Sequence, residues 1–303
     1  MKKFLIIVGL IGAFILLILC CIELWVRSIP NEYSYKHQYL EENIGSIRVL
    51  NVGSSIGRSG FNPVYFSVHG FNAANVSQDI ETDCAIINKY LDKADSLKTV
   101  IFALLPGSFC GRMGDGIESW RLRKYHSYMD LDVEKPSWKE CLEINNLSAA
   151  EQQILKSLRG VNTVDCNRFG YGNDKEAVSE KEKLAQGIRI SKLHNEGYNP
   201  KLYDIIVPKV ESTVAACKDR NIKVLFVMLP SYHTYTSRIN QQMLEECDSI
   251  AKTISEEHDN VLYINLFTDT LFKTEDFRNS NHLSNEGAKK LTKMIDNIIC
   301  SNE

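Results

Sequence analysis

The chain begins with one long apolar run. Between Phe4 and Ile22 there are 19 residues without a charge or a strongly polar group. A helix rises about 1.5 Å per residue, so this run is long enough to cross the roughly 30 Å hydrocarbon core of a bilayer. Lys2 and Lys3 precede the run, and by the positive-inside rule they favour a cytoplasmic N-terminus with the rest of the chain outside. We therefore expect a single-pass transmembrane anchor within residues 1–27.

A cleaved signal peptide is the alternative interpretation of this run. Signal peptides have a shorter apolar region that ends in small residues around the cleavage site. Here the run ends in Leu19-Cys20-Cys21-Ile22-Glu23, which offers no such site, so the sequence favours an uncleaved anchor. The next residues, 28–46, are polar and contain Pro30, and we expect them to form a stalk.

Beyond residue 46, strand-like and helix-like segments alternate along the chain. Short apolar runs predict strands at 47–52, 71–76, 99–105, 222–229 and 261–267. Helical spacing predicts helices at 79–91, 202–217, 239–254 and 285–299. Continuous apolar strands that alternate with amphipathic helices are typical of a parallel sheet covered on both faces. We therefore expect one α/β domain over residues 47–303, with its site at the carboxyl ends of the strands.

The interval from about 110 to 200 interrupts this alternation. It contains few strand-like runs and a polar stretch from 173 to 183. A structureless loop of that length is uncommon inside a domain. We expect a partly helical insertion that covers the strand ends and forms one wall of a substrate cleft. A surface insertion without a role in the site is the alternative.

Composition narrows the choice of partners. The 303 residues include 35 Lys and Arg against 38 Asp and Glu, for a formal net charge of −3. This balance argues against binding of polyanions through a strongly basic surface, and so against a nucleic-acid partner. Two of the nine cysteines lie in the apolar run, and no pair has the CxxC spacing of a zinc or redox site. We expect most cysteines to be small buried residues, with one or two disulfides at most, and the sequence indicates no metal or organic cofactor.

Two polar residues, Ser55 and His282, follow predicted strands and are expected at the carboxyl edge of the sheet, where the site of such a fold lies. Ser55 follows the first predicted strand in the sequence Asn51-Val52-Gly53-Ser54-Ser55, so its hydroxyl is expected at the active edge of the sheet. His282 lies in the loop that enters the last helix, after the last strand. A neutral imidazole there can accept the proton of a serine hydroxyl on a neighbouring strand end.

These two motifs resemble those of the SGNH hydrolase superfamily, also called GDSL-type esterases and lipases. In that family the nucleophilic serine lies in a Gly-Asp-Ser motif, and the histidine lies in a C-terminal DxxH motif. Gly53-Ser54-Ser55 and Asn279-Ser280-Asn281-His282 match these motifs, so Ser55 takes the nucleophile position and His282 takes the base position. The resemblance implies a flavodoxin-like three-layer sandwich with a parallel sheet.

A finer resemblance concerns where such proteins act. The Phe61-Asn62-Pro63 turn and the segment from His282 to Ala288 resemble membrane-anchored bacterial SGNH-like proteins. Some members of that group modify acyl groups on envelope polysaccharides. The resemblance therefore implies a domain outside the inner membrane, facing the periplasm or the exterior, and an acylated carbohydrate or small ester as the substrate.

The chain departs from the family pattern at three places. Asn279 replaces the aspartate of DxxH, and a neutral amide can orient an imidazole but cannot stabilise an imidazolium by charge. Ser77 stands at the position of a family glycine whose N–H serves the oxyanion hole. The family's oxyanion asparagine has no counterpart after the third predicted strand, where Asn75 and Ser108 are the candidate replacements.

Three functions remain open at this stage. The first is an anchored extracytoplasmic serine esterase or O-acyltransferase, with Ser55 as nucleophile, His282 as base and Asn279 as orienting group. The second is a catalytically impaired protein of the same fold that binds a glycan or a partner in an envelope assembly. The third is an unrelated flavodoxin-like binding module. His233, which also follows a predicted strand, is a further candidate for the cleft. The sequence does not indicate an oligomeric state.

Overall fold

The computed structural model describes residues 1–172 and 176–301. Over these residues the strands are β1 Val49–Gly53, β2 Gly70–Asn72, β3 Thr99–Leu104, β4 Lys223–Met228 and β5 Val261–Asn265. The α-helices are α1 Lys2–Ser28, α2 Glu32–Asn43, α3 Ser55–Gly60, α4 Ile80–Tyr90, α5 Leu122–Met129, α6 Leu147–Leu158, α7 Glu180–Glu196, α8 Tyr203–Asp219, α9 His233–Thr236, α10 Gln241–Glu257 and α11 Asn285–Ser301. Every predicted strand and helix of the domain therefore has a counterpart.

The strands form one parallel sheet in the order β2-β1-β3-β4-β5. This 2-1-3-4-5 order is that of the flavodoxin-like doubly wound fold, which confirms the predicted fold class. A parallel sheet needs apolar side chains on both faces because helices cover both. The central strands meet this requirement, since all six residues of β3 are buried.

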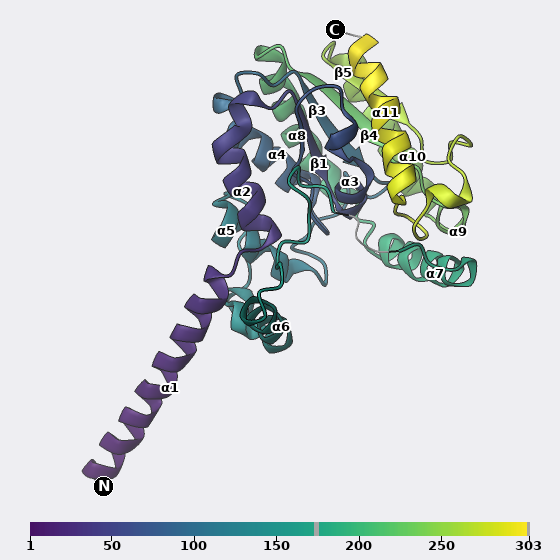
Figure 1. Ribbon diagram of the computed structural model, residues 1–303. Helices are drawn as coiled ribbons and strands as arrows, with labels where there is room; N and C mark the ends of the chain where they lie inside the picture. Colours follow the sequence, from purple (N-terminus) through teal and green to yellow (C-terminus); the bar gives the residue numbers. More distant parts are fainter. Residues whose placement is uncertain (173–175, 302–303) are drawn as a thin grey trace.

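Side chains alternate between two cores along each strand. On β3, Val100, Phe102 and Leu104 enter the larger core, and Ile101 and Ala103 enter the smaller one. Helices α4, α8 and α10 contribute to the larger core, whereas α3 and α11 contribute to the smaller one. The result is three layers, with the sheet between two helical layers (Figure 1).

Helix α1 stands apart from these layers (Figure 1). It is long and apolar enough to cross a membrane, and none of its most apolar window is buried inside the protein. The length and composition of α1 support a membrane span. A signal sequence near the N-terminus has the same length and composition.

The segment 28–46, which we expected to be a polar stalk, is part of the domain. It forms α2, which starts with a capping box in which Asn31 accepts from the backbone N–H of Ser34. Leu40 and Ile44 are buried in the larger core. The prediction was wrong because the segment's low overall hydrophobicity hid a few apolar positions on one face of the helix.

The insertion is partly helical, as expected, and contains α5, α6 and α7. Figure 1 places α6 and α7 at the end of the sheet from which α1 departs. None of the nine cysteines is paired in a disulfide. Cys84, Cys110, Cys217 and Cys247 are buried, as small apolar residues are.

Candidate active site

Ser55 is placed at the carboxyl edge of the sheet by a tight turn after β1. Gly53 has a φ of 137°, a conformation that L side chains rarely adopt, and a Cβ there would lie 2.8 Å from the Cβ of Ala103. A Cβ on Gly57 would lie 2.6 Å from the same atom. The two glycines therefore let α3 start directly after β1 and pack against β3. Ser55 is the first residue of α3 and is half-buried.

His282 is held by a turn in the loop that enters α11. The side-chain oxygen Oδ1 of Asn279 accepts the backbone N–H groups of Asn281, at 3.1 Å, and of His282, at 2.9 Å. Phe277 and Leu283 form an isolated antiparallel bridge across the same loop. The local sequence thus forms a closed turn that fixes the imidazole before the helix begins.

The structure brings the two ends of the domain together at this point. Nε2 of His282 lies 2.9 Å from Oγ of Ser55. Nδ1 of the same ring lies 3.1 Å from Oδ1 of Asn279. The two backbone N–H donors identify this atom as the amide oxygen, and an amide oxygen can only accept hydrogen bonds. Nδ1 of the ring must therefore carry the hydrogen, so Nε2 presents its lone pair to Ser55. This is the arrangement in which an imidazole can remove the serine proton.

The predicted oxyanion residues differ in their placement. Asn75 is buried, and its side-chain NH₂ donates to the carbonyl of Ala73, at 3.3 Å, and to Oε1 of Gln78, at 3.0 Å. Its Oδ1 is buried without a recorded hydrogen-bond partner. Both donors of Asn75 are thus engaged inside the protein, although the residue lines one of the cavities that Ser55 also lines.

Ser77 takes the conformation of the glycine that it replaces. Its φ is 58°, in the left-handed region. Ser108 supports the turn after β3, where its Oγ accepts the backbone N–H of Leu105 at 2.9 Å. Ser55, Ser77 and Ser108 line one cavity of about 430 Å³, so the structure brings these three predicted residues together.

His233 is not part of this group. It is exposed at the start of α9, its ring lies against Tyr232 with centroids 4.3 Å apart, and it lines neither cavity that contains Ser55. Its strand, β4, does end at the active edge, but the structure does not bring His233 to either cavity that contains Ser55. The prediction that His233 lines the cleft was therefore wrong.

A second, polar cavity of about 890 Å³ is also lined by Ser55. Ser55, Asn279 and His282 line it together with residues of α2 and of the insertion. The insertion residues that line it are Trp120, Arg121, Arg123, Lys124, Glu143, Ala149, Gln153, Thr163, Asp165, Glu176, Val178, Glu182, Gln186 and Arg189. Ser55 thus lies where two cavities share a side chain.

Buried ion pairs organise the wall of the polar cavity. Glu32 on α2 contacts Lys36 and Arg58, each at 2.7 Å, and Arg58 lies one turn after Ser55 on α3. Burial alone would raise the pKa of Glu32, but the charges of Lys36 and Arg58 outweigh it and hold that pKa below its ordinary value. Glu143 pairs in the same way with Arg123 and Lys124, each at 3.0 Å.

These ion-paired residues were missed by the sequence analysis. Lys36 is completely buried and also donates to the carbonyl of Ala74. Glu32 and Lys36 are four residues apart, a spacing that indicates a helical pair. That signal predicts a helix at 32–43 but not its burial, because the partners Arg58 and Ala74 are distant in sequence.

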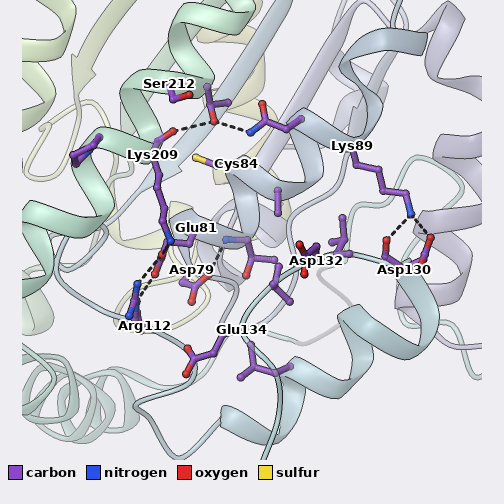
Figure 2. Close-up of a pocket in the computed structure, with 18 residues that line it drawn as sticks. Asp79, Glu81, Cys84, Lys89, Arg112, Asp130, Asp132, Glu134, Lys209 and Ser212 are labelled. Atoms are coloured by element: carbon purple, nitrogen blue, oxygen red, sulfur yellow. Dashed lines mark hydrogen bonds and ion pairs between the residues drawn. The ribbon is translucent and has the colours of Figure 1, made fainter.

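A larger cavity, of about 1100 Å³, lies elsewhere, between α4 and α8 (Figure 2). Arg112 and Lys209 of this cavity both donate to Glu81. Burial raises the pKa of its Cys84 thiol to about 12, which leaves this sulfur unreactive near neutral pH. Among the described residues that line this cavity, none is a histidine. The Ser55 cavities are therefore the better candidates for catalysis.

Comparisons with known proteins give structural neighbours only. No protein-family model matches the chain, and no curated protein matches it. The chain is similar to the structure of a GDSL-like lipase from Bacteroides thetaiotaomicron, with 11% identity over 89% of this chain and 100% of that one and a TM-score of 0.44. A protein from Bacteroides fragilis assigned as an acylhydrolase gives 11% identity over 88% and 95% of the two chains, with a TM-score of 0.44.

A third neighbour, from Desulfitobacterium hafniense, is assigned to the G-D-S-L family of lipolytic proteins, with 10% identity over 83% and 98% of the two chains and a TM-score of 0.40. The neighbours thus carry the names of the group that the motifs of this chain resemble. At these identities and TM-scores they do not transfer an activity, and the fold assignment rests on the strand order of the chain itself.

Proposed function

We propose that this protein is a serine esterase or O-acyltransferase that acts on an acylated carbohydrate outside the cytoplasm. The observation that carries the proposal is the hydrogen-bonded series of Ser55, His282 and Asn279 at the carboxyl edge of a parallel sheet. Such a series is the geometric signature of an activated nucleophile.

In the proposed reaction, Oγ of Ser55 attacks the carbonyl carbon of the ester while Nε2 of His282 accepts the serine proton. The C–O bond to the sugar oxygen then breaks, and His282 returns the proton to that oxygen, which leaves an acyl group on Ser55. Water or a second hydroxyl group, deprotonated by His282, attacks the acyl carbon and restores Ser55. Backbone N–H groups at Ser55 and Ser77 are the donors proposed for the oxyanion.

The two cavities support the choice of substrate. The polar cavity of about 890 Å³ is lined by side chains that can hydrogen-bond to sugar hydroxyl groups, such as Gln153, Gln186 and Thr163. The smaller cavity, of about 430 Å³, has apolar side chains in its lining, including Ile56, Leu105 and Met113, and suits a short acyl group. An ester bound at Ser55 would place its sugar part in the polar cavity and its acyl part in the smaller one, since Ser55 lines both.

The test is hydrolysis of a short acyl ester, such as p-nitrophenyl acetate, by the full-length protein. We expect Ser55→Ala to lower kcat/KM by at least about 10³, because loss of a nucleophile disables the whole catalytic unit. Ser54→Ala is the matched control and should retain the rate, since no hydrogen bond is recorded for the Ser54 hydroxyl. Equal rates for the wild type and Ser55→Ala would refute an esterase.

A catalytically impaired glycan-binding protein is the second candidate. It is favoured by the neutral amide at position 279 and by the internal use of both Asn75 donors. If ester hydrolysis is absent, binding of an acetylated oligosaccharide to the full-length protein and to Ser55→Ala would distinguish this candidate from an unrelated function.

The anchor is a separate part of the proposal. We propose that α1 remains attached and crosses the inner membrane, with the domain outside. Resistance to extraction by alkaline carbonate would support an integral anchor, and protease accessibility of the domain in intact spheroplasts would support its orientation. Release by carbonate would overturn the anchor without bearing on the chemistry at Ser55.

A further inference from the structure

The insertion exposes a group of large apolar side chains beside the end of α1. We call this group the apolar rim; its members are Trp138, Leu142, Leu147, Leu158 and Val161. Trp138 is 81% exposed, Leu147 73% and Leu158 67%, so water covers most of each side chain in the isolated chain. Leu147 and Leu158 are eleven residues apart, about three turns, and therefore share one face of α6.

Hydrogen bonds fix the rim relative to α1. The carboxylate of Glu23 accepts the backbone N–H groups of Glu143 and Ile144, each at 3.1 Å. The guanidinium of Arg27 donates to the carbonyl of Cys141 at 3.0 Å. These bonds hold the segment from Trp138 to α6 against the last two turns of α1, and Figure 1 shows α6 next to that end of the helix.

The height of these contacts along α1 is informative. Glu23 directly follows the apolar run 4–22, so it marks the level at which α1 leaves the hydrocarbon. Trp25 is also at this level and is 43% exposed. The rim is therefore held beside the point where a spanning α1 would emerge from the bilayer.

The chemistry of the rim is that of a membrane interface. Lys139 lies 5.6 Å from the ring centroid of Trp138, and Lys156 and Arg159 are exposed next to Leu155 and Leu158. Tryptophan with lysine and arginine is the combination enriched at headgroup level, because each combines an apolar body with a polar end. Single exposed apolar residues are common on soluble proteins, but they are not typically grouped with tryptophan, lysine and arginine in this way.

We propose that the apolar rim lies in the interface of the membrane that α1 crosses, so that lipid covers it. This inference rests on the proposed anchor. Ala149 and Gln153, on the opposite face of α6, line the polar cavity that contains Ser55. One helix, about 10 Å thick, thus separates the bilayer from this cavity. The arrangement favours an ester presented at the membrane surface, such as an acylated saccharide carried on a lipid.

The first experiment measures the depth of Trp138. The full-length chain carrying Trp25→Phe and Trp120→Phe keeps Trp138 as its single tryptophan and is reconstituted into phosphatidylcholine vesicles. Some vesicles contain lipid brominated in the upper acyl chain, which quenches only nearby tryptophan. The matched control adds Trp138→Phe and Asp95→Trp, since Asp95 is exposed in the turn before β3, at the opposite edge of the sheet.

We expect brominated lipid to remove most of the Trp138 fluorescence and to leave the tryptophan at position 95 unchanged. If the fluorescence of Trp138 were the same in brominated and in plain vesicles, as for the tryptophan at position 95, the proposal would be overturned. Extraction of the chain by alkaline carbonate would overturn it as well. This readout does not need catalysis, so it stands if Ser55 proves inactive.

The second experiment asks whether the rim serves the reaction. Leu147→Glu with Leu158→Glu should slow hydrolysis of an ester embedded in the vesicles several-fold and leave hydrolysis of a water-soluble ester unchanged. Val64→Glu, at a 54% exposed position near α11, is the matched control and should change neither rate. Equal rates of the rim variant and the wild type on the embedded ester would overturn a role in substrate access.

Discussion

Three donors converge on a single atom at Asn279. Its Oδ1 receives two backbone N–H groups and the ring N–H of His282, at distances of 2.9 to 3.1 Å. An aspartate oxygen would accept the same three bonds, so the turn preserves the geometry of the family's acid and loses only its charge. The neutral amide therefore selects the correct tautomer of His282 but gives little stabilisation to an imidazolium.

Restoring the charge is the corresponding test. We expect Asn279→Asp to raise kcat/KM for a short ester about 10- to 100-fold, since each pKa unit of added imidazolium stabilisation is worth about a factor of ten. The acidic limb of the pH–rate profile should move to higher pH for the same reason. The double variant Asn279→Asp with Ser55→Ala should show no gain. A rate that stays unchanged in Asn279→Asp would argue against His282 as the base.

Ser77 has a left-handed backbone conformation, which its Cβ makes less favourable than it would be for glycine. We expect Ser77→Gly to raise the free energy of unfolding by about 0.5–1 kcal/mol, because the strain released is larger than the unfolded-state entropy that glycine adds. Ser148→Gly, at an exposed position of α6, is the control and should lower stability, as glycine does inside a helix. Denaturant unfolding of both variants measures the difference. Destabilisation by Ser77→Gly would show that the Ser77 side chain stabilises the turn.

At the scale of elements, α2 connects the anchor to the site. It contributes Leu40 to the larger core and Glu32 to the ion pair with Arg58, one turn from Ser55. We expect Leu40→Ala to lower the free energy of unfolding by about 2–5 kcal/mol, because it leaves a cavity at a completely buried position. Gln38→Ala, on the exposed side of the same helix, should change it by less than about 0.5 kcal/mol.

Chemical denaturation of the two α2 variants, in the detergent used for the wild type, provides the measurement. Similar midpoints for Leu40→Ala and Gln38→Ala would mean that α2 is a peripheral connection. Residues 28–46 would then be better described as a stalk than as part of the folded domain.

At the scale of the whole molecule, a buried acid beneath the site couples stability to pH. Asp83 on α4 accepts from Nε2 of Gln78 at 2.6 Å and from the backbone N–H of Gly53. Burial raises the pKa of this carboxyl well above its ordinary value of 3.8. A raised folded-state pKa contributes stability that is complete below pH 3.8 and is lost as the pH rises through the folded-state pKa.

Asp83→Asn removes this titration and keeps a neutral side chain of the same shape. We expect the variant to gain stability over the wild type as pH rises above 3.8, by about 1.4 kcal/mol per pH unit until the folded carboxyl ionises. Unfolding free energies measured across a pH series test this. Asp132→Asn, on an exposed loop, should follow the wild-type curve. A constant difference between Asp83→Asn and the wild type would show that Asp83 does not titrate in the folded range.

The sequence by itself determined the sheet, the order of its elements and the two ends of the site. Continuous apolar runs and helical spacing depend on neighbours along the chain, so β1 to β5 and α4, α8, α10 and α11 could be predicted. The motifs around Ser55 and His282 are likewise local, because each is a turn closed by its own residues.

Only the tertiary structure decided which side chains meet across the chain. The ion pair of Glu32 with Arg58 and the hydrogen bond from Lys36 to the carbonyl of Ala74 depend on contacts between distant segments. The internal use of Asn75 and the exposure of His233 depend on how the chain packs around them. The docking of residues 28–46 and of the insertion against α1 is of the same kind. A polar or weakly apolar segment can be buried only where other segments supply hydrogen-bond and ion-pair partners for its polar groups. Those partners are distant in sequence, so the segment's own pattern does not predict them.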